Sequence, residues 1–165
     1  MAFDGFLKID GIDGESQDDK HKSWVEILSY SHGVSQAATG SASSGGARAA
    51  ERANHQDLSI VKTLDAASPK LALFCCNGTH IKTVKLELCR AAGDKTKYME
   101  YLLSDVLISS VRPGGSSGGA ETLPLEEVSF NYGKIEWTYT KTDHKTGKPA
   151  GDVKGWWSTV ENKGG

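Results

Sequence analysis

The chain has 165 residues and a formal net charge of −2, with 24% charged side chains. This length suits a single domain over residues 1–165, and the small net charge gives no general attraction to nucleic acid or to an anionic membrane. No apolar run reaches the roughly 18 residues of a membrane-spanning helix, so we expect no membrane insertion. The amino-terminal residues lack a basic patch followed by an apolar core, so we expect no secretory signal peptide. We expect a protein that folds in the cytoplasm, or that leaves it by a route that needs no cleaved signal.

Alternation of apolar and polar residues predicts a chain made mainly of strands. The predicted strands cover residues 3–10, 24–34, 56–64, 83–90, 98–111, 125–141 and 153–160. One short helix is predicted from Ser68, as its N-cap before Pro69, to the stop signal Asn77-Gly78. Three apolar residues at helical spacing should dock it on a sheet: Leu71, Phe74 and Cys75. The expected fold class is mainly β, a two-sheet β-barrel or sandwich with one short α-helix and long flexible loops.

The longest predicted strand, 125–141, changes the parity of its apolar residues at Gly133. The two sets are Val128, Phe130 and Tyr132 on even positions, then Ile135, Trp137 and Tyr139 on odd ones. One extra residue at Gly133–Lys134, a β-bulge, would repair this slip. Fully extended, the strand would span about 55 Å, whereas a compact domain of this size has a radius of gyration of about 15 Å. The strand must therefore bend, and Gly133 is the predicted corner.

The predicted strand 24–34 has apolar residues on both faces. Val25 and Ile27 share one parity, whereas Trp24, Leu28 and Tyr30 share the other. Such a pattern indicates that both faces are covered, one by the protein's own core and the other by a partner subunit. Trp24 and Tyr30 are therefore candidate contacts between subunits.

Residues 35–54 have no apolar periodicity and are rich in Gly, Ser and Ala. A loop of this length in a compact domain is usually functional or disordered. We favour an extended arm that reaches another molecule, with Arg48, Glu51 and Arg52 as candidate contacts to it; the alternative is a floppy linker. Residues 112–120 are expected to form a second flexible loop, and residues 161–165 a flexible tail.

No catalytic or metal-binding motif is evident. There is no Gly-x-Ser-x-Gly or His-Glu-x-x-His, and the adjacent Glu126 and Glu127 must point to opposite faces of their strand. We expect a protein that is not an enzyme and that has no cofactor and no metal. We expect no chemical role for three further groups of residues. His32, His55 and His80 should be surface or packing residues, and Asp18, Asp19 and His21 should belong to a solvated loop. Cys75, Cys76 and Cys89 should be small buried thiols without a disulfide framework.

Several segments resemble, in the same order, the Hcp (haemolysin-coregulated protein) family of bacterial type VI secretion systems. They are Phe6–Ser16, Asp19–Gly33, Asp57–Lys62, Ser68–Leu71, Val106–Val111 and Leu125–Tyr139. The resemblance covers nearly the whole chain, and the opening segment is the most specific part of it.

This resemblance implies a β-barrel subunit that forms homohexameric rings. The rings would stack into a tube inside a contractile sheath, with a spike protein at the tip and effector proteins carried in the lumen. It also implies synthesis in the bacterial cytoplasm and secretion without a cleaved signal peptide. The alternatives are a monomeric carbohydrate-binding sandwich, for which the tryptophans and tyrosines would form a sugar platform, and a small secreted hydrolase.

Overall fold

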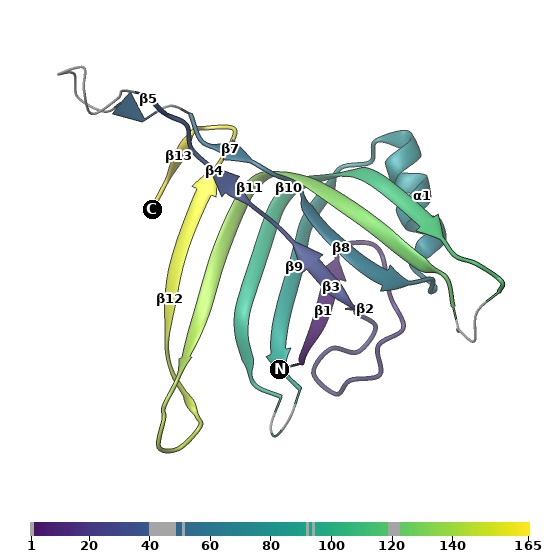
Figure 1. Ribbon diagram of the computed structural model, residues 1–165, viewed down its shortest axis with the longest axis horizontal. Coiled ribbons are helices and arrows are strands. Elements are labelled where there is room, and N and C mark those ends of the chain that lie inside the picture. The colour runs from purple at the N-terminus through teal and green to yellow at the C-terminus, as the bar shows by residue number, and fades with distance from the viewer. Residues whose placement is uncertain (1, 40–48, 51, 92, 94, 119–122) are drawn as a thin grey trace.

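The computed structural model describes residues 2–39, 49–50, 52–91, 93, 95–118 and 123–165 (Figure 1). Its elements in chain order are β1 (Phe3–Ile9), β2 (Val25–Ile27), β3 (Ser29–Ser31), β4 (Val34–Ser35), β5 (Ala38–Thr39), β6 (Ala49–Ala50), β7 (Asn54–His55), β8 (Leu58–Thr63), α1 (Ser68–Asn77), β9 (Ile81–Arg90), β10 (Lys97–Gly114), β11 (Leu125–Thr142), β12 (Pro149–Ser158) and β13 (Lys163–Gly164). The prediction of a mainly β chain with one short helix is confirmed.

The strands form a curved antiparallel sheet in the order β13-β12-β11-β10-β9-β1-β2, and β8 joins it by pairing with β11 and with β3. Only Leu28 separates β2 from β3, and there the chain leaves β1 and pairs with β8 instead. The sheet therefore folds over on itself as a two-layered sandwich. The ladders of the described strands do not join into one unbroken ring, because the strand path is interrupted at Leu28.

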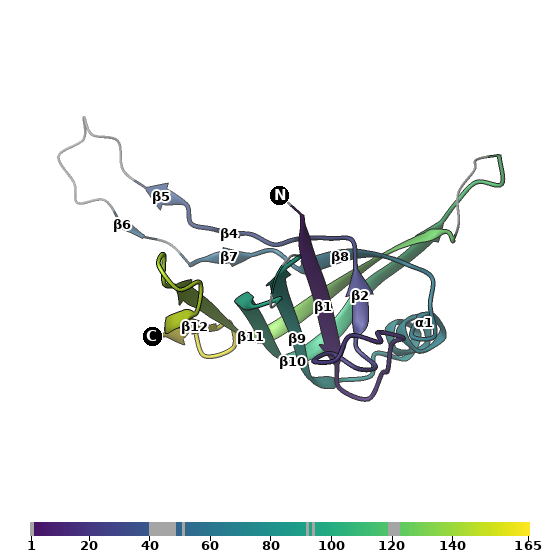
Figure 2. The same ribbon diagram turned by 90° about the horizontal axis from the view of Figure 1, so that it is seen from below.

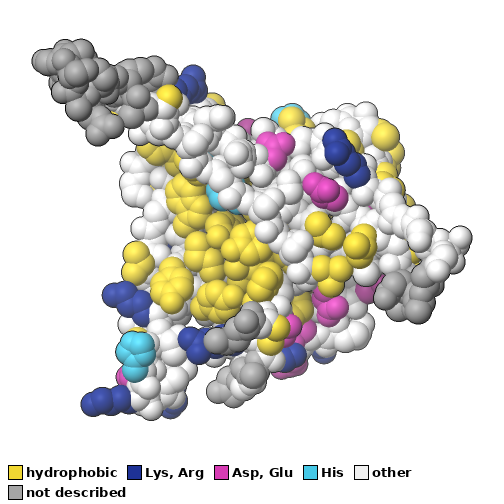
Figure 3. Space-filling view, viewed as in Figure 1, with side chains coloured by type: hydrophobic (Ala, Val, Ile, Leu, Met, Phe, Trp, Pro, Cys, Tyr) yellow, Lys and Arg dark blue, Asp and Glu magenta, His cyan; other side chains and the backbone are white. Residues whose placement is uncertain are grey.

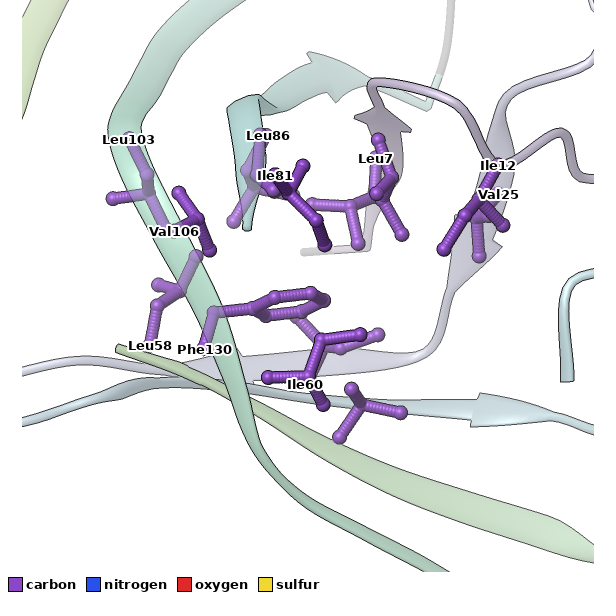
Figure 4. Packing of buried hydrophobic residues seen from close by; sticks show 14 of the residues in the cluster. Leu7, Ile12, Val25, Leu58, Ile60, Ile81, Leu86, Leu103, Val106 and Phe130 are labelled. Atoms are coloured by element: carbon purple, nitrogen blue, oxygen red, sulfur yellow. The ribbon is translucent and has the colours of Figure 1, made fainter. Parts of the chain in front are cut away.

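The hydrophobic core lies between the two layers of this sandwich (Figure 4). Side chains from β1, β9 and β10 meet side chains from β8 and β11. Its fully buried members include Leu7, Val25, Leu58, Ile60, Leu71, Val84, Leu86, Leu103, Val106, Val128, Phe130 and Ile135. They come mainly from the predicted inward-facing positions, so period-two alternation predicted most of the core.

Helix α1 ends where the sequence predicts. Gly78 is its C-cap with a left-handed φ of 66°, and its N–H donates to the carbonyl of Phe74. The predicted N-cap is wrong by one residue, because Ala67 occupies that position without a side-chain cap. The Ser68 hydroxyl donates to Glu126 Oε2 instead, at 2.7 Å. No helix in the described ranges is long and apolar enough to cross a membrane.

The predicted bulge at Gly133–Lys134 is wrong. Strand β11 keeps one register with β10 across this point, since Lys134 pairs with Ser104 and Tyr132 with Val106. The register shift lies instead on β10, between Ile108 and Ser110. The apolar parity changes at the same point on both strands: the residues of the pairs Leu103↔Ile135 and Val106↔Tyr132 all lie in the core, and between them Asp105, opposite Gly133, has a left-handed φ. At this point β11 also exchanges its other neighbour, which is β8 up to Phe130 and β12 from Lys134 onward.

The predicted bend is present, because both β10 and β11 curve over the top of the molecule at mid-length (Figure 1). Across from Gly133, Asp105 has a left-handed φ of 53°. A Cβ atom on Gly133 would lie 2.9 Å from Asp105 Oδ2. Glycine is therefore required here for the close approach of Asp105, and not for a bulge.

Two predicted loops are more ordered than expected. Residues 161–165 are not a flexible tail, because β13 pairs with β12 and Gly165 exchanges two backbone hydrogen bonds with Trp156. The described ends of the 35–54 arm form the ladders β4–β7 and β5–β6, which project away from the sandwich (Figure 2). In the predicted loop 112–120, residues 112–114 belong to β10 and residues 119–120 lie outside the described residues.

Candidate assembly surface

An aromatic surface continues the core face of the sheet onto β10, β11 and β12. Directly paired residues share a face, and the pairs here are Tyr101↔Trp137, Met99↔Tyr139 and Tyr139↔Val153. Tyr139 is 48% exposed and Val153 52% exposed. We call this set (Met99, Tyr101, Trp137, Tyr139 and Val153) the aromatic face, and Figure 3 shows hydrophobic side chains gathered over these strands.

The aromatic face becomes exposed toward Tyr139 and Val153, because the opposing part of the domain ends beside Tyr101 and Trp137. Tyr101 pairs with Leu86 on β9, and Leu86 is fully buried in the core. Beyond this point β8 no longer accompanies β11, and β12 extends the sheet instead. The same sheet face therefore changes from protein core to solvent-facing surface. A partly exposed hydrophobic surface of this kind is typical of a protein–protein contact.

Of the two predicted subunit contacts, only Tyr30 lies beside this surface. Its hydroxyl lies 3.4 Å from that of Tyr101, and its ring packs edge-on against Phe3. Trp24 is half-buried elsewhere, against the His21 ring and with Lys8 Nζ 5.9 Å from its ring centroid. Trp24 therefore helps to hold the 10–24 loop on its own subunit.

Two histidines lie at the root of the arm. His32 packs against the rings of Tyr101, Tyr132 and Trp137, and both of its ring nitrogens are buried without a hydrogen-bond partner among the described residues. His55 Nδ1 lies 3.0 Å from the Tyr132 hydroxyl. Burial lowers the pKa of both histidines, and for His32 the nearby His55 lowers it further. The expectation that they are packing residues is correct for both.

The three arm residues proposed as contacts have different outcomes. Arg48 and Glu51 lie outside the described residues. The Arg52 guanidinium donates to the carbonyl of Thr159 at 3.1 Å, so it contacts its own subunit near the end of β12. This bond fixes the returning strand of the arm beside the carboxyl-terminal segment.

The expectation of a solvated loop is wrong for His21 and for the half-buried Asp18, whereas Asp19 is exposed as expected. The His21 side chain is buried and stacked on Phe6, with Nδ1 2.6 Å from Asp18 Oδ2 and Nε2 3.5 Å from Glu87 Oε1. The hydrogen bond from His21 holds the pKa of Asp18 below its ordinary value. The cluster ties the 10–24 loop to β9. No group of three His, Cys, Asp or Glu side chains in the described ranges has an arrangement that could hold a metal ion.

The three cysteines are free and occupy different environments. Cys89 is buried, and burial raises the pKa of its thiol to about 11, which keeps it protonated and unreactive. Cys75 is half-buried, whereas Cys76 is exposed on α1. The expectation of buried thiols is therefore wrong for Cys76.

Sequence reasoning missed a buried ion pair between Lys62 and Glu126, although it placed Glu126 and Glu127 correctly on opposite faces. Lys62 is 0% exposed and Glu126 2% exposed, whereas Glu127 is exposed. The sequence did indicate this pair, because it places a lysine and a glutamate at inward positions of predicted strands. Such charged groups are buried only when they are paired.

Comparison with known proteins identifies the family of this chain. A family described as "Type VI secretion system effector, Hcp" matches residues 6–139. The chain belongs to the Hcp family. It is 37% identical over 163 residues to protein hcp1 of Pseudomonas aeruginosa, with 98% of each chain covered.

Solved structures agree with this membership. A structure described as that of a type six secretion system protein has a TM-score of 0.93 at 36% identity, covering 99% of this chain and 100% of the other. Hcp1 from Salmonella typhimurium has a TM-score of 0.80 at 33% identity, with 99% of each chain covered. The chain is accordingly a secreted tube protein of a type VI secretion system, with a structural role.

Proposed function

We propose that six copies of this chain form a closed ring and that rings stack into the tube of the secretion system. The observation that carries the proposal is the aromatic face, which leaves Tyr139 and Val153 about half exposed beside a continuous core. A ring requires a heterologous interface, in which one patch of each subunit meets a different patch of the next. The aromatic face supplies one such patch, and the neighbouring subunit covers it.

The 35–54 arm serves contact between rings in this proposal. Its described strands project from the sandwich and contribute no residue to the hydrophobic core (Figure 2). Ordering a segment costs about 1–2 kcal/mol per residue. Within its own subunit the arm has the Arg52–Thr159 hydrogen bond at its root, so a receiving surface on another ring would offset the cost of ordering the rest. A stack of rings supplies such a surface at each level.

The remaining partners follow from the tube role. A contractile sheath surrounds the tube, a spike protein closes its tip, and effector proteins travel in its lumen. Family membership supports each of these partners. Export then follows sheath contraction and needs no cleaved signal peptide. In this function the subunit acts as a structural carrier, not as an enzyme.

Native mass measurement tests the ring. At micromolar concentration we expect six times the subunit mass of 17.7 kDa. The double variant Tyr139→Asp/Val153→Asp should form fewer rings, because it places charge on the aromatic face. The subunit should still fold, since both side chains are about half exposed in it. Val160→Asp is the matched control, since Val160 is 72% exposed and outside the aromatic face. A native mass equal to one subunit for the parent protein would refute the proposal.

A further inference from the structure

The hairpin between β11 and β12 carries an uncompensated positive charge. Residues 141–154 contain four lysines and two aspartates, so their net charge is 4 − 2 = +2. Both aspartates are engaged locally: Asp143 Oδ1 accepts from the Lys145 backbone N–H at 2.7 Å, and Asp152 Oδ1 accepts from the Thr140 hydroxyl at 2.8 Å. We call Lys141, Lys145, Lys148 and Lys154 the basic hairpin. None of these four side chains forms an ion pair with a carboxylate of the described residues.

An opposite charge excess lies around β1 and β2. Residues 10–19 contain five acids and no lysine or arginine, so their net charge is −5. A hollow of about 500 Å³ beside them is lined in part by Asp4, Glu26 and the exposed Leu28. Glu15 and Glu26 line a smaller adjoining hollow. We call Asp4, Glu15 and Glu26 the acidic face, and none of the three forms an ion pair within the described part of the chain.

These two charged surfaces lie on different flanks of the subunit. The basic hairpin is at the lower left of Figure 1, whereas the loop between β1 and β2 is at the lower right. A single subunit therefore does not bring them together. Separate patches of complementary charge are what a head-to-tail contact between identical copies requires.

We infer that the basic hairpin of one copy docks on the acidic face of the next copy in the ring. The inference rests on the proposed ring and names the second patch of its interface. The hairpin adjoins the aromatic face, and the acidic hollow has Leu28 in its lining, so each patch combines charge with apolar surface. Charge pairs at the edge of an interface set its register and speed its association, while the apolar centre supplies most of the affinity. The hairpin thus orients each subunit on its neighbour.

Charge reversal on either side tests the pairing. Lys145→Glu/Lys148→Glu changes the basic hairpin, and Glu15→Lys/Glu26→Lys changes the acidic face, at four exposed positions. Each double variant should raise the protein concentration at which half of the rings dissociate by about tenfold or more, measured by native mass over a dilution series. Lys70→Glu/Lys82→Glu is the matched control for the hairpin variant, with the same charge change at exposed positions outside both patches. It should leave ring dissociation unchanged.

Mixing the two double variants gives the decisive result. In an equimolar mixture each reversed hairpin meets a reversed face, and each original hairpin meets an original face, so rings that alternate the two variants should form. Native mass spectrometry resolves the alternating composition as three copies of each. The inference is overturned if either double variant keeps the parent's ring stability, or if the mixture forms no rings although far-ultraviolet circular dichroism shows both variants folded. A parent protein with the mass of one subunit would instead refute the proposed function itself.

Discussion

Lys62 Nζ lies 2.7 Å from Glu126 Oε2, and these directly paired residues of β8 and β11 are both buried. Lys62 also lies 2.9 Å from Asp65 Oδ1 and 3.2 Å from Ser68 Oγ at the start of α1. The cluster therefore joins the helix to two strands of the sandwich. A buried charge of this kind is tolerated only while its partners remain in place.

Removing one member of this pair should destabilise the subunit strongly. Lys62→Met leaves Glu126 buried without its cation, and we expect a loss of about 3–5 kcal/mol in the free energy of unfolding. Urea denaturation followed by circular dichroism measures it. Lys62→Met/Glu126→Leu should recover much of the loss, because no unpaired charge remains. Lys70→Met, at an exposed position of α1, should change stability by no more than about 0.5 kcal/mol. Equal effects of Lys62→Met and Lys70→Met would contradict this account.

Gly133→Ala should destabilise the corner shared by β10 and β11. The new Cβ would lie 2.9 Å from Asp105 Oδ2 and 3.2 Å from Val160 Cγ2, so one of them must move. We expect a cost of about 1–3 kcal/mol in the free energy of unfolding. Adding Asp105→Gly should relieve the clash and also suits the left-handed φ of that residue. Gly155→Ala is the control, since its nearest neighbour would be 3.8 Å away. Thermal unfolding of the parent and these three variants decides the matter, and a neutral Gly133→Ala would count against the close approach.

Subunit stability should fall as the solution is acidified below about pH 6.5, the ordinary pKa of histidine. Folding lowers the pKa of His32 and His55, so in this range the unfolded chain binds protons that the folded chain does not. Each histidine then lowers the free energy of unfolding by at most about 1.4 kcal/mol per pH unit of acidification. This effect vanishes above the pKa of the histidine in the unfolded chain. Urea unfolding at several values between pH 7.5 and 5.5 measures this slope. His32→Phe keeps an aromatic ring in place and should reduce it, whereas an unchanged slope would exclude His32 as the cause.

Shortening the arm should separate ring formation from stacking. Replacing residues 40–50 by a short Gly-Ser linker removes the tip and leaves the root near His32 and Arg52 intact. We expect the variant to fold and to form single rings, with weaker stacking and reduced secretion. Electron microscopy of assembled tubes and the amount of exported protein measure these two effects. Tubes and export equal to those of the parent would refute the role of the arm, and a variant that fails to fold would assign the arm to the subunit core.

Local sequence patterns were enough to predict the fold class, the helix and most of the core. Period-two alternation is a local property, and it correctly placed Val84, Leu86 and Leu88 inside the sandwich. Gly78 stopped α1 as expected because the left-handed C-cap conformation is itself a local preference. The resemblance of whole segments identified the family, which the comparisons then confirmed.

Strand neighbours, ion-pair partners and the burial of loop residues depend on segments far apart in the sequence, so they could be found only in the tertiary structure. The parity change in β11 looked like a bulge, but the paired strands β10 and β11 change parity together at Asp105 and Gly133, where β11 also exchanges β8 for β12. No local pattern tells which strand lies alongside. In the same way, Lys62 acquires its partner from a strand 64 residues away, and His21 is buried because Glu87 on β9 lies near it. The aromatic face is also a tertiary result. Trp137 and Tyr139 follow the same alternation as core residues, but Trp137 is only half-buried, beside His32, and Tyr139 is 48% exposed, because the opposing layer ends near them.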